Sequence, residues 1–361
     1  MHPIYQVSLP DGTVVINGPS NRALSCEVVD QEGRDSDSCT LVIDDRDGEV
    51  VIPPRGVTLT VSMGYLETGI FPMGAFIVDE VTVGGFPRAM VVRCRAADLR
   101  DQWKQGRTQD YHDMTLGDVI GKIAQRNGMV ARVQGELSSF KYTYVGQTEE
   151  SDLHFMTRLG AKHDATAKPT NGVLVFAKKG SMESASGLPI GSAIARLPGN
   201  VLYYDAMFKD RPRHSQAVGS YWDQPLSDRM DELGQGTQGP IFKLLPMFPD
   251  GKEEAKAAAQ ARSDKLARDE GELNIGIIGD PAVMAEAPLV VVGVRTGVDG
   301  TWRIKTATHR IDSNGYETSI TAEYPGASSS GTSGVGAIGE GATTTPLLSD
   351  PPSGGHSDGV N

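Results

Sequence analysis

The hydrophobic pattern of this chain changes twice, and that change constrains the fold more than any other feature. Residues 1–104 contain short β-branched runs, at positions 39–45, 57–65, 74–83 and 90–96. Asp-Gly pairs begin at Asp11 and Asp47, between apolar runs. Asp-Gly favours two-residue hairpins because both positions tolerate positive φ. Five or more short strands at this spacing are typical of a β-sandwich or a barrel.

A helical pattern replaces the strands at about residue 105. In the run TLGDVIGKIAQRNG, Thr115 is placed to cap a helix and Asp118 follows three residues later, as in a shortened capping box. Gly128 supplies a left-handed end. The apolar residues between them recur at helical spacing: Leu116, Val119, Ile120 and Ile123. The run therefore predicts an amphipathic helix.

A second helix is predicted to start near Thr148 or Ser151. Its buried side is expected to carry Leu153, Met156 and Leu159, which recur at helical spacing. The run GVLVFAKKG, at 172–180, indicates a strand that follows it. We therefore expect residues 105–185 to form a small α/β domain.

The strand pattern returns at about residue 199. Three runs, PLVVVGVRTG, TWRIKTATHRI and YETSITAEY, are separated by Asp299-Gly300 and Asn314-Gly315, which predicts a meander. We expect residues 186–325 to form a second β domain. The chain as a whole is then α+β and mainly β.

One helix is expected to interrupt the second β domain, around residues 252–271. This run is rich in Ala, Glu, Lys and Arg, which are good helix formers. Its apolar stripe is thin and consists of Ala255, Ala259 and Leu266. We expect the helix to lie on a barrel surface or to bundle with neighbouring elements.

Residues 326–361 have the composition of a linker or tail. Gly, Ser, Thr and Pro dominate, and Lys and Arg are absent. A segment of this composition does not fold by itself, so an ordered tail implies a partner chain. Pro346, Leu347 and Leu348 form its compact apolar group, and we expect them to anchor an extended segment on a partner. The alternative is a solvated tail.

Charge and length exclude several classes of protein. The chain has 34 Lys and Arg against 46 Asp and Glu, a formal net charge of −12. A general nucleic-acid binder needs a basic surface to displace counterions, so this class is disfavoured. No run approaches the roughly 18 apolar residues of a membrane helix, and the first residues do not resemble a secretory signal. We expect assembly in a reducing cytoplasm.

The short motifs that resemble nucleotide-binding sites lack the structural context that such sites need, and a nucleophile motif is absent. Gly334, Gly336 and Gly339 spell G-x-G-x-x-G, but they lie in the tail, without the strand and helix that a dinucleotide fingerprint needs. The run GDVIGK is one residue short of a phosphate loop and lies in a predicted helix. The chain contains no G-x-S-x-G nucleophile elbow. No catalytic residue and no cofactor is therefore predicted.

No metal site is predicted either. His154 and His163 are nine residues apart, without the spacing that presents two ligands on one helix face. Asp44, Asp45 and Asp47 lack the twelve-residue ladder of a calcium loop, so we assign them to a turn. The acidic group Glu149, Glu150 and Asp152 suits a helix N-terminus, where negative charge complements the macrodipole.

The three cysteines give neither a disulfide framework nor a zinc pattern. If the runs around Cys26 and Cys39 form a hairpin about Gly33, the two residues lie near cross-strand register. A disulfide between them is then geometrically accessible. Free thiols in a core remain the simpler interpretation for Cys26, Cys39 and Cys94.

Three runs of this sequence, taken in order, resemble one family. Residues 36–83 look like the N-terminal barrel of the bacteriophage late control protein D family, the hub proteins of contractile tails. The run EESDLHFMTRLGAKHDATAKPTNGVLVF is similar to the matching segment of VgrG-type spike proteins. The run WRIKTATHRIDSNGYETSITAEYP resembles the closing hairpin of the second barrel. Together they span most of residues 20–325.

This resemblance implies two tail-tube-like antiparallel barrels, at 1–104 and 186–325. It implies a homotrimer whose six barrels form a ring that joins a hexameric tail tube to a trimeric spike. Other baseplate proteins, the tape measure protein and DNA in transit would be its partners, in the virion baseplate after assembly in the host cytoplasm. No needle-like repeat follows the second barrel, so the spike is expected to be a separate protein.

Two other functions stay open at this point. Some tail-tip proteins carry a cell-wall hydrolase, although no segment outside the barrels and the α/β domain is long enough to house one. The other alternative is the hub of an effector-delivering contractile injection system.

Overall fold

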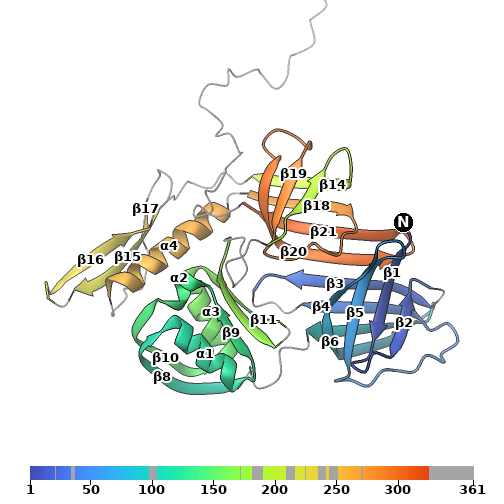
Figure 1. Ribbon diagram of the computed structural model, residues 1–361, viewed down its shortest axis with the longest axis horizontal. Coiled ribbons are helices and arrows are strands. Elements are labelled where there is room, and N and C mark those ends of the chain that lie inside the picture. The colour runs from blue at the N-terminus through green and yellow to red at the C-terminus, as the bar shows by residue number, and fades with distance from the viewer. Residues whose placement is uncertain are drawn as a thin grey trace, which may run out of the picture.

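The structure, a computed structural model, has four visible parts (Figure 1). An N-terminal β unit and a C-terminal β unit lie side by side, an α/β unit lies next to them, and an arm made of one helix and three strands extends to one end. The structure describes residues 1–20, 22–33, 37–96, 103, 105–170, 172–180, 190–208, 216–223, 225–234, 241–243, 251–269 and 271–324.

The N-terminal β unit contains seven antiparallel strands. In order of hydrogen bonding they run β3-β4-β7-β6-β5-β1-β2. Their alternating inward residues form one core, which includes Tyr5, Val61 and Phe76. The strands are β1 (Pro3–Ser8), β2 (Val14–Gly18), β3 (Ala23–Gln31), β4 (Ser38–Asp44), β5 (Thr58–Tyr65), β6 (Gly69–Gly84) and β7 (Ala89–Ala96).

The α/β unit packs three helices against two small sheets around a second core. One sheet pairs β8 with β10, and the other has the order β11-β12-β9. The elements are β8 (Gly106–Thr115), α1 (Leu116–Arg126), β9 (Val130–Val133), α2 (Gly135–Ser138), β10 (Lys141–Ser151), α3 (Asp152–His163), β11 (Ala165–Thr170) and β12 (Val173–Lys178).

The described part of the C-terminal β unit contains six strands around a third core, which includes Ile275, Leu289 and Trp302. Its strands pair in the order β14-β18-β21-β20-β19-β13. They are β13 (Ala193–Arg196), β14 (Val201–Phe208), β18 (Gly271–Ile278), β19 (Pro288–Val292), β20 (Gly300–Asp312) and β21 (Gly315–Glu323).

The arm is inserted between β14 and β18. It consists of β15 (Gln216–Asp223), β16 (Asp228–Leu233), β17 (Ile241–Lys243) and α4 (Lys252–Arg268). Helix α4 lies on this small sheet and touches α3. A Cβ on Gly219 of β15 would lie 2.2 Å from the carbonyl oxygen of Ala255, so the absence of a side chain there permits the close packing.

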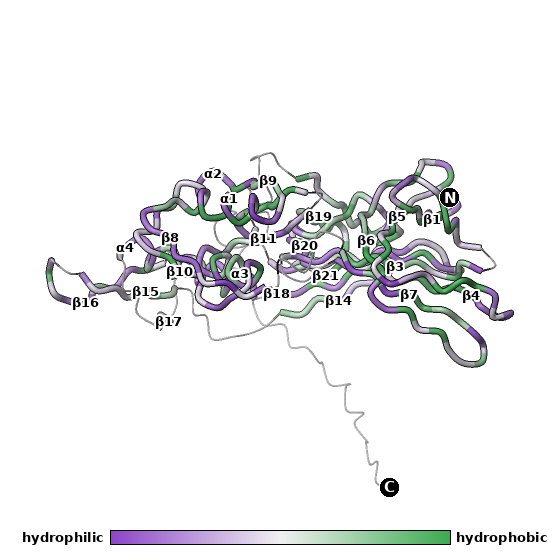
Figure 2. Tube along the Cα trace, turned by 90° about the horizontal axis from the view of Figure 1, so that it is seen from below, coloured by the Kyte–Doolittle hydropathy of each residue, from purple (hydrophilic) through white to green (hydrophobic). Residues whose placement is uncertain are grey.

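The two β units form one continuous sheet, because β3 of the first pairs with β20 of the second. This antiparallel pairing runs from Thr306 opposite Gln31 to Ile311 opposite Cys26. We call it the joint. Figure 2 shows the sheet running through both units, with hydrophobic and hydrophilic residues alternating along its strands. The joint therefore fixes the orientation of one unit against the other.

The two β units repeat the same pattern of strand pairing. The path β3-β4-β7-β6-β5-β1 of the first unit corresponds, strand for strand and in chain order, to β14-β18-β21-β20-β19-β13 of the second. The last pair differs in direction, since β1 is antiparallel to β5 whereas β13 is parallel to β19. The topology thus contains an internal duplication.

The irregularities of the two units also coincide. Strand β6 skips one residue against β7 between Val78 and Glu80, and β20 skips one against β21 between Ile304 and Thr306. Strands β3 and β14 each skip one residue against their partners as well. Because bulges pin the register of a sheet, these positions align the two units residue by residue.

Most elements predicted from the sequence are confirmed. Thr115 caps α1 in a capping box with Asp118, and Gly128 follows it with φ of 72°. Ser151 caps α3. On α3, Leu153 is only partly buried, whereas Phe155, which the predicted stripe omitted, is fully buried.

Three sequence expectations were wrong in detail. Asp47-Gly48 does not close a hairpin, because the strands on either side of it, β4 and β5, are not neighbours. The run at 216–223, which lies within the second β domain expected at 186–325, joins the sheet of the arm rather than the C-terminal β unit. Helix α4 packs with neighbouring elements, as one of the two alternatives predicted, and Ala255 and Ala259 are buried, but Leu266 of the predicted stripe is only partly buried.

Candidate functional site

The joint buries residues of both β units in a common core. Ile311 and Tyr316 of the C-terminal unit belong to the core of the N-terminal unit. The Tyr65 hydroxyl donates to the carbonyl of Gly279 at 2.9 Å, and the rings of Tyr65 and Tyr316 are 5.5 Å apart. The joint is therefore sealed by apolar packing as well as by the strand ladder.

His309 lies fully buried at the same joint. Its ring nitrogens are 3.0 Å from the Tyr316 hydroxyl and 3.0 Å from the carbonyl of Val283. Burial lowers the pKa of this imidazole, and the hydrogen bond to Val283 offsets only part of that effect. A neutral histidine that bonds through both nitrogens acts here as a structural link.

A buried charge network lies beside the joint. The guanidinium of Arg303, which is fully buried, forms ion pairs with Glu32 at 2.5 Å and with Glu323 at 2.6 Å. Arg268 of α4 contacts Glu323 at 3.3 Å and pairs with Asp164, at the end of α3. These pairs connect the N-terminal unit, the C-terminal unit, the arm and the α/β unit.

A second group of charges attaches the α/β unit to the N-terminal unit. Lys168 Nζ lies 2.5 Å from Asp30 and 3.2 Å from Asp37, and Lys179 lies 3.2 Å from Glu32. Burial, together with the charge of Asp30, raises the pKa of Asp37 to about 6 although Lys168 opposes the shift. Much of this attachment is therefore electrostatic.

A cleft of about 690 Å³ opens between these parts. Its walls carry Glu32, Lys179 and Asp164, together with Arg262 and Lys265 of α4. Asp164 is already paired with Arg268, and Glu32 with Arg303. The cleft therefore follows the seam between four structural parts, and its charged walls hold those parts together.

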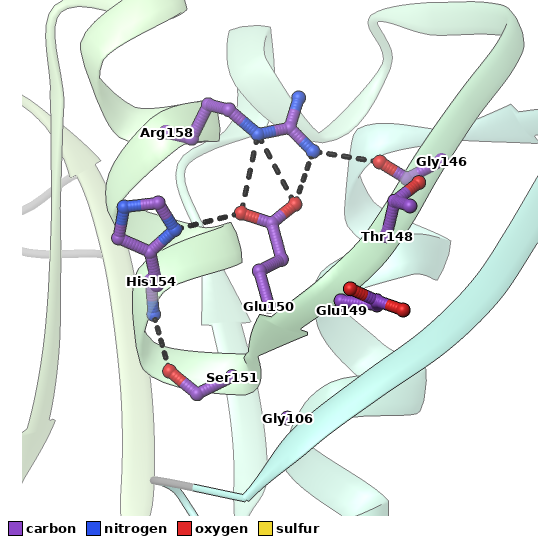
Figure 3. Close-up of a pocket in the computed structure, with 8 residues that line it drawn as sticks. All are labelled: Gly106, Gly146, Thr148, Glu149, Glu150, Ser151, His154 and Arg158. Carbon is purple, nitrogen blue, oxygen red and sulfur yellow. Dashed lines mark hydrogen bonds and ion pairs between the residues drawn. The ribbon is translucent and has the colours of Figure 1, made fainter.

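A shallower pocket of about 910 Å³ lies on the α/β unit, at the start of α3 (Figure 3). There Glu150 accepts hydrogen bonds from Arg158 and lies 2.9 Å from His154 Nδ1, while Arg158 also donates to the carbonyl of Gly146 at 2.6 Å. Burial opposes ionisation of Glu150, but the bonds from Arg158 and His154 outweigh it and lower its pKa.

Several pocket side chains, among them Glu150, Ser151 and Arg158, hold the local fold. The Ser151 hydroxyl accepts from the backbone N–H of His154 and caps α3. Glu150 is an ion-paired carboxylate rather than a proton donor. The sequence placed this acidic group at a helix N-terminus, but it gave no sign of the ion pair between Glu150 and Arg158.

Asp152, the third acidic residue of that group, is fully buried. Its carboxylate accepts hydrogen bonds from Asn127 and Gln147, each at 2.9 Å, and lies 3.5 Å from Arg126. It therefore ties the start of α3 to the end of α1. Spacing alone gave no signal for these partners, because they lie on other elements.

The other predicted acidic and histidine residues are also placed. Asp44 pairs with Arg46 and Asp47 with Arg22. His163 is buried against Tyr142, and burial lowers its pKa to about 4. Within the described ranges, no three side chains of the metal-ligating types gather in a suitable arrangement. No helix of the described chain is long and apolar enough to cross a membrane.

The cysteines lie on neighbouring strands of the N-terminal unit. The expected hairpin of β3 and β4 exists, but Cys26 lies opposite Leu41 and Cys39 opposite Val28 and Cys94. The disulfide considered for Cys26 and Cys39 is not formed, since all three thiols are free and buried. Burial raises the pKa of Cys94 to about 12. The expected anchor, Pro346, Leu347 and Leu348, lies outside the described residues.

Comparisons with known proteins identify relatives over nearly the whole chain. A "Probable baseplate hub protein" of Escherichia phage 186 is 28% identical over 89% of this chain and 92% of its own length. The protein of the same name in Escherichia phage P2 is 29% identical over 89% and 93%. This chain is thus similar, over most of its length, to two proteins named as phage baseplate hubs. No family model matches it.

Solved structures of tail proteins share the fold of this chain. A 43 kDa tail protein of prophage MuSo2 from Shewanella oneidensis has a TM-score of 0.64 at 16% identity, over 89% of this chain and 98% of its own. A tail protein of Neisseria meningitidis MC58 has a TM-score of 0.65 at 13% identity, over 90% and 97%. A type VI secretion component of E. coli has a TM-score of 0.55 at 12% identity, over 88% and 76%. At these identities the likeness concerns the fold.

Proposed function

We propose that this protein is the structural hub of a contractile tail baseplate, located in the virion tail after assembly in the host cytoplasm. The observation that carries the proposal is the relationship to two baseplate hub proteins over about 89% of the chain. The site geometry agrees with it, because the buried Arg303–Glu32 pair links two units and the Glu150–Arg158 pair stabilises the α/β unit internally. The proposed role is therefore mechanical and not enzymatic.

The hub is proposed to be a homotrimer of tube-like barrels. In this arrangement residues 1–104 and 186–325 each supply one barrel, and residues 105–185 lie between them in the chain. The repeated strand order of the two β units supports this, because two similar units per copy give six in a trimer. Such a ring would match a hexameric tail tube on one side and a trimeric spike on the other.

The proposed lumen would let DNA pass without binding it. The net charge of −12 supports a channel of acidic and neutral side chains, since phosphate binding needs cations. Tape measure and other baseplate proteins are the further proposed partners. A strongly positive channel in the assembled ring would contradict this part of the proposal.

The tail, residues 326–361, is proposed to fasten the hub to the spike through Pro346, Leu347 and Leu348. Burying each leucine contributes roughly 1.5–3 kcal/mol before ordering costs, and those costs are high in a Gly-rich segment. Deleting residues 326–361 should leave the trimer intact and weaken spike attachment. A truncated hub that recruits the spike as well as the full chain would refute the anchor.

The hub role is tested by mass and by activity. Mass photometry of the purified protein at high concentration should give three copies, and particles assembled with the tube protein should contain hub in multiples of three. A stable dimer would contradict the ring. Turnover of purified peptidoglycan by the protein would contradict the purely structural role.

A further inference from the structure

Strand β14 is an open edge of the C-terminal β unit. In the described chain it pairs with β18 on one side only, and its last residues are hydrophobic (green in Figure 2). Met207 and Phe208 are each 52% exposed. An open strand edge with exposed apolar side chains is a site for pairing with another strand.

The second half of β6 is a matching open edge in the N-terminal unit. Up to Val78 its free side is covered by β5 and the residue before it, with a backbone hydrogen bond from Val78 to Val57 at 2.9 Å. Beyond Val78, among the described strands, β6 pairs only with β7. Val83 on this stretch is 49% exposed.

The joint shows how this fold covers the same two edges within one chain. Strand β20 is the counterpart of β6, and it is covered beyond Ile304 by β3, the counterpart of β14. The point at which one neighbouring strand ends also matches in the two units. The backbone N–H of Ile304 donates to the carbonyl of Ala287, as the backbone N–H of Val78 donates to the carbonyl of Val57. Among the described strands, one edge of each kind is therefore paired inside the chain, and one of each kind has no partner.

The bulges that coincide in the two units show which residues would lie opposite each other if the two open edges, β14 and the second half of β6, paired between copies. Glu80 of β6 corresponds to Thr306 of β20, so Thr82 corresponds to Thr308. Tyr203 of β14 corresponds to Ser25 of β3, so Met207 corresponds to Val29. In the joint, Thr308 lies opposite Val29. The same pairing between copies would place Thr82 opposite Met207.

We propose that β14 of one copy pairs antiparallel with residues 80–84 of β6 in the neighbouring copy, with Thr82 opposite Met207 of that neighbour. The partner is a second copy of this chain, and the proposal rests on the ring-forming hub proposed above. Val83 would then face Ala206, as His309 faces Val28 inside the joint. His309 and Val28 are 0% and 1% exposed, which is the burial expected for the new pair.

The hairpin between β6 and β7 supplies a second contact. In the joint, the hairpin between β20 and β21 brings Ile311 and Tyr316 into the neighbouring core. The hairpin in the corresponding place carries Phe86, which is 92% exposed. In the proposed pairing it reaches the open side of the neighbour's C-terminal unit, where Tyr204 is 40% exposed.

Disulfide trapping tests the register directly. The double variant Thr82→Cys/Met207→Cys should form intermolecular disulfides on mild oxidation. Its counterparts in the joint, Thr308 and Val29, are a non-hydrogen-bonded pair, and in an antiparallel ladder such pairs bring their side chains closest together. Thr82→Cys/Asp205→Cys, two residues out of register, should cross-link at least tenfold less. The single variants are the controls, since the native cysteines are buried.

The outcomes distinguish a failure of the proposed pairing between copies from a failure of the proposed hub role. A protein that assembles normally but favours the Asp205 pair, or forms neither link, overturns the proposed pairing and leaves the hub proposal intact. A protein that stays monomeric at high concentration overturns both. Efficient linkage of the Met207 pair supports the proposal.

A second variant tests the edge without cysteines. Val83→Lys places a charge where the partner strand must pack, and should weaken association at least tenfold. Val15→Lys on β2 is the matched control, because Val15 is also 49% exposed and lies outside the proposed contact. Equal association of the two variants would overturn the proposal.

Discussion

Arg303 is a buried cation that holds carboxylates of two different units together. Its guanidinium is fully buried between Glu32 of the N-terminal unit and Glu323 of its own unit. Nearby Glu286 is partly buried, and this burial raises the pKa of its carboxyl although Arg303 opposes the shift. A buried charge is tolerated only when its partners surround it, so this arginine fixes the relative position of several elements.

Removing Arg303 should be costly. Arg303→Leu leaves Glu32 and Glu323 without their shared partner, and the expected loss is about 3–5 kcal/mol in the free energy of unfolding. Urea unfolding followed by circular dichroism would measure it. Arg95→Leu is the control, because its pair with Asp79 is solvent-exposed and should cost at most about 1 kcal/mol. Similar losses for both variants would contradict the special role of Arg303.

His163 should make the stability of the α/β unit depend on pH. Its pKa falls from 6.5 to about 4 on folding because the ring is buried against Tyr142. The unfolded chain therefore binds the proton first, and stability is full above pH 6.5 and is lost as the pH falls towards 4. The expected slope is at most about 1.4 kcal/mol per pH unit.

The His163→Gln variant isolates this effect. A glutamine keeps a polar partner for Tyr142 but does not titrate, so the difference in unfolding free energy between wild type and variant should shrink between pH 6.5 and 4. Thermal unfolding of both proteins across this range measures the difference. A difference that stays constant would refute the assignment.

Helix α1 shows how one element is specified locally and then constrained by its neighbour. Its capping box and apolar stripe follow from the sequence. Its two glycines, however, lie in different surroundings: a Cβ on Gly117 would come within 2.4 Å of Ser138 Oγ on α2, whereas a Cβ on Gly121 would meet nothing within 4 Å. Only the first glycine is required by packing.

The two glycines therefore make a matched pair of substitutions. Gly121→Ala should stabilise the protein by about 0.5–1 kcal/mol, because alanine loses less backbone freedom in a helix interior. Gly117→Ala should destabilise it, since α2 must move. Differential scanning calorimetry of both variants measures the sign, and stabilisation by both would show that α2 yields freely.

The whole molecule is organised by one sheet that runs through both β units, with the α/β unit and the arm attached beside it (Figure 1). The sheet joint combines backbone hydrogen bonds with buried apolar side chains. The attachment of the α/β unit depends more on pairs such as Lys168 with Asp30. The two kinds of contact should respond differently to salt.

Assembly through the proposed pairing of β14 with β6 should persist at high salt. Val83, Ala206 and Phe208 carry no charge, and screening by 1 M salt does not act on apolar contacts or strand hydrogen bonds. Sedimentation velocity between 0.1 and 1 M NaCl should give an unchanged mass for the assembled ring. Dissociation at high salt would mean that charges hold the copies together.

The sequence by itself determined the local elements of this protein. Capping at Thr115 and Ser151 depends on residues within one turn, and strand periodicity depends on alternate positions. Both are local and are written in consecutive residues. The mainly β character and the small α/β unit between two β regions followed from them.

Only the tertiary structure decided how these elements pair. The joint brings residues 26–31 against residues 306–311, and a free strand edge carries no local sign of which other strand will pair with it. The partners of Arg303 and Asp152 likewise come from distant elements. The duplicated register became visible only through bulges, because a bulge is defined by the strand opposite it and not by the residue that forms it.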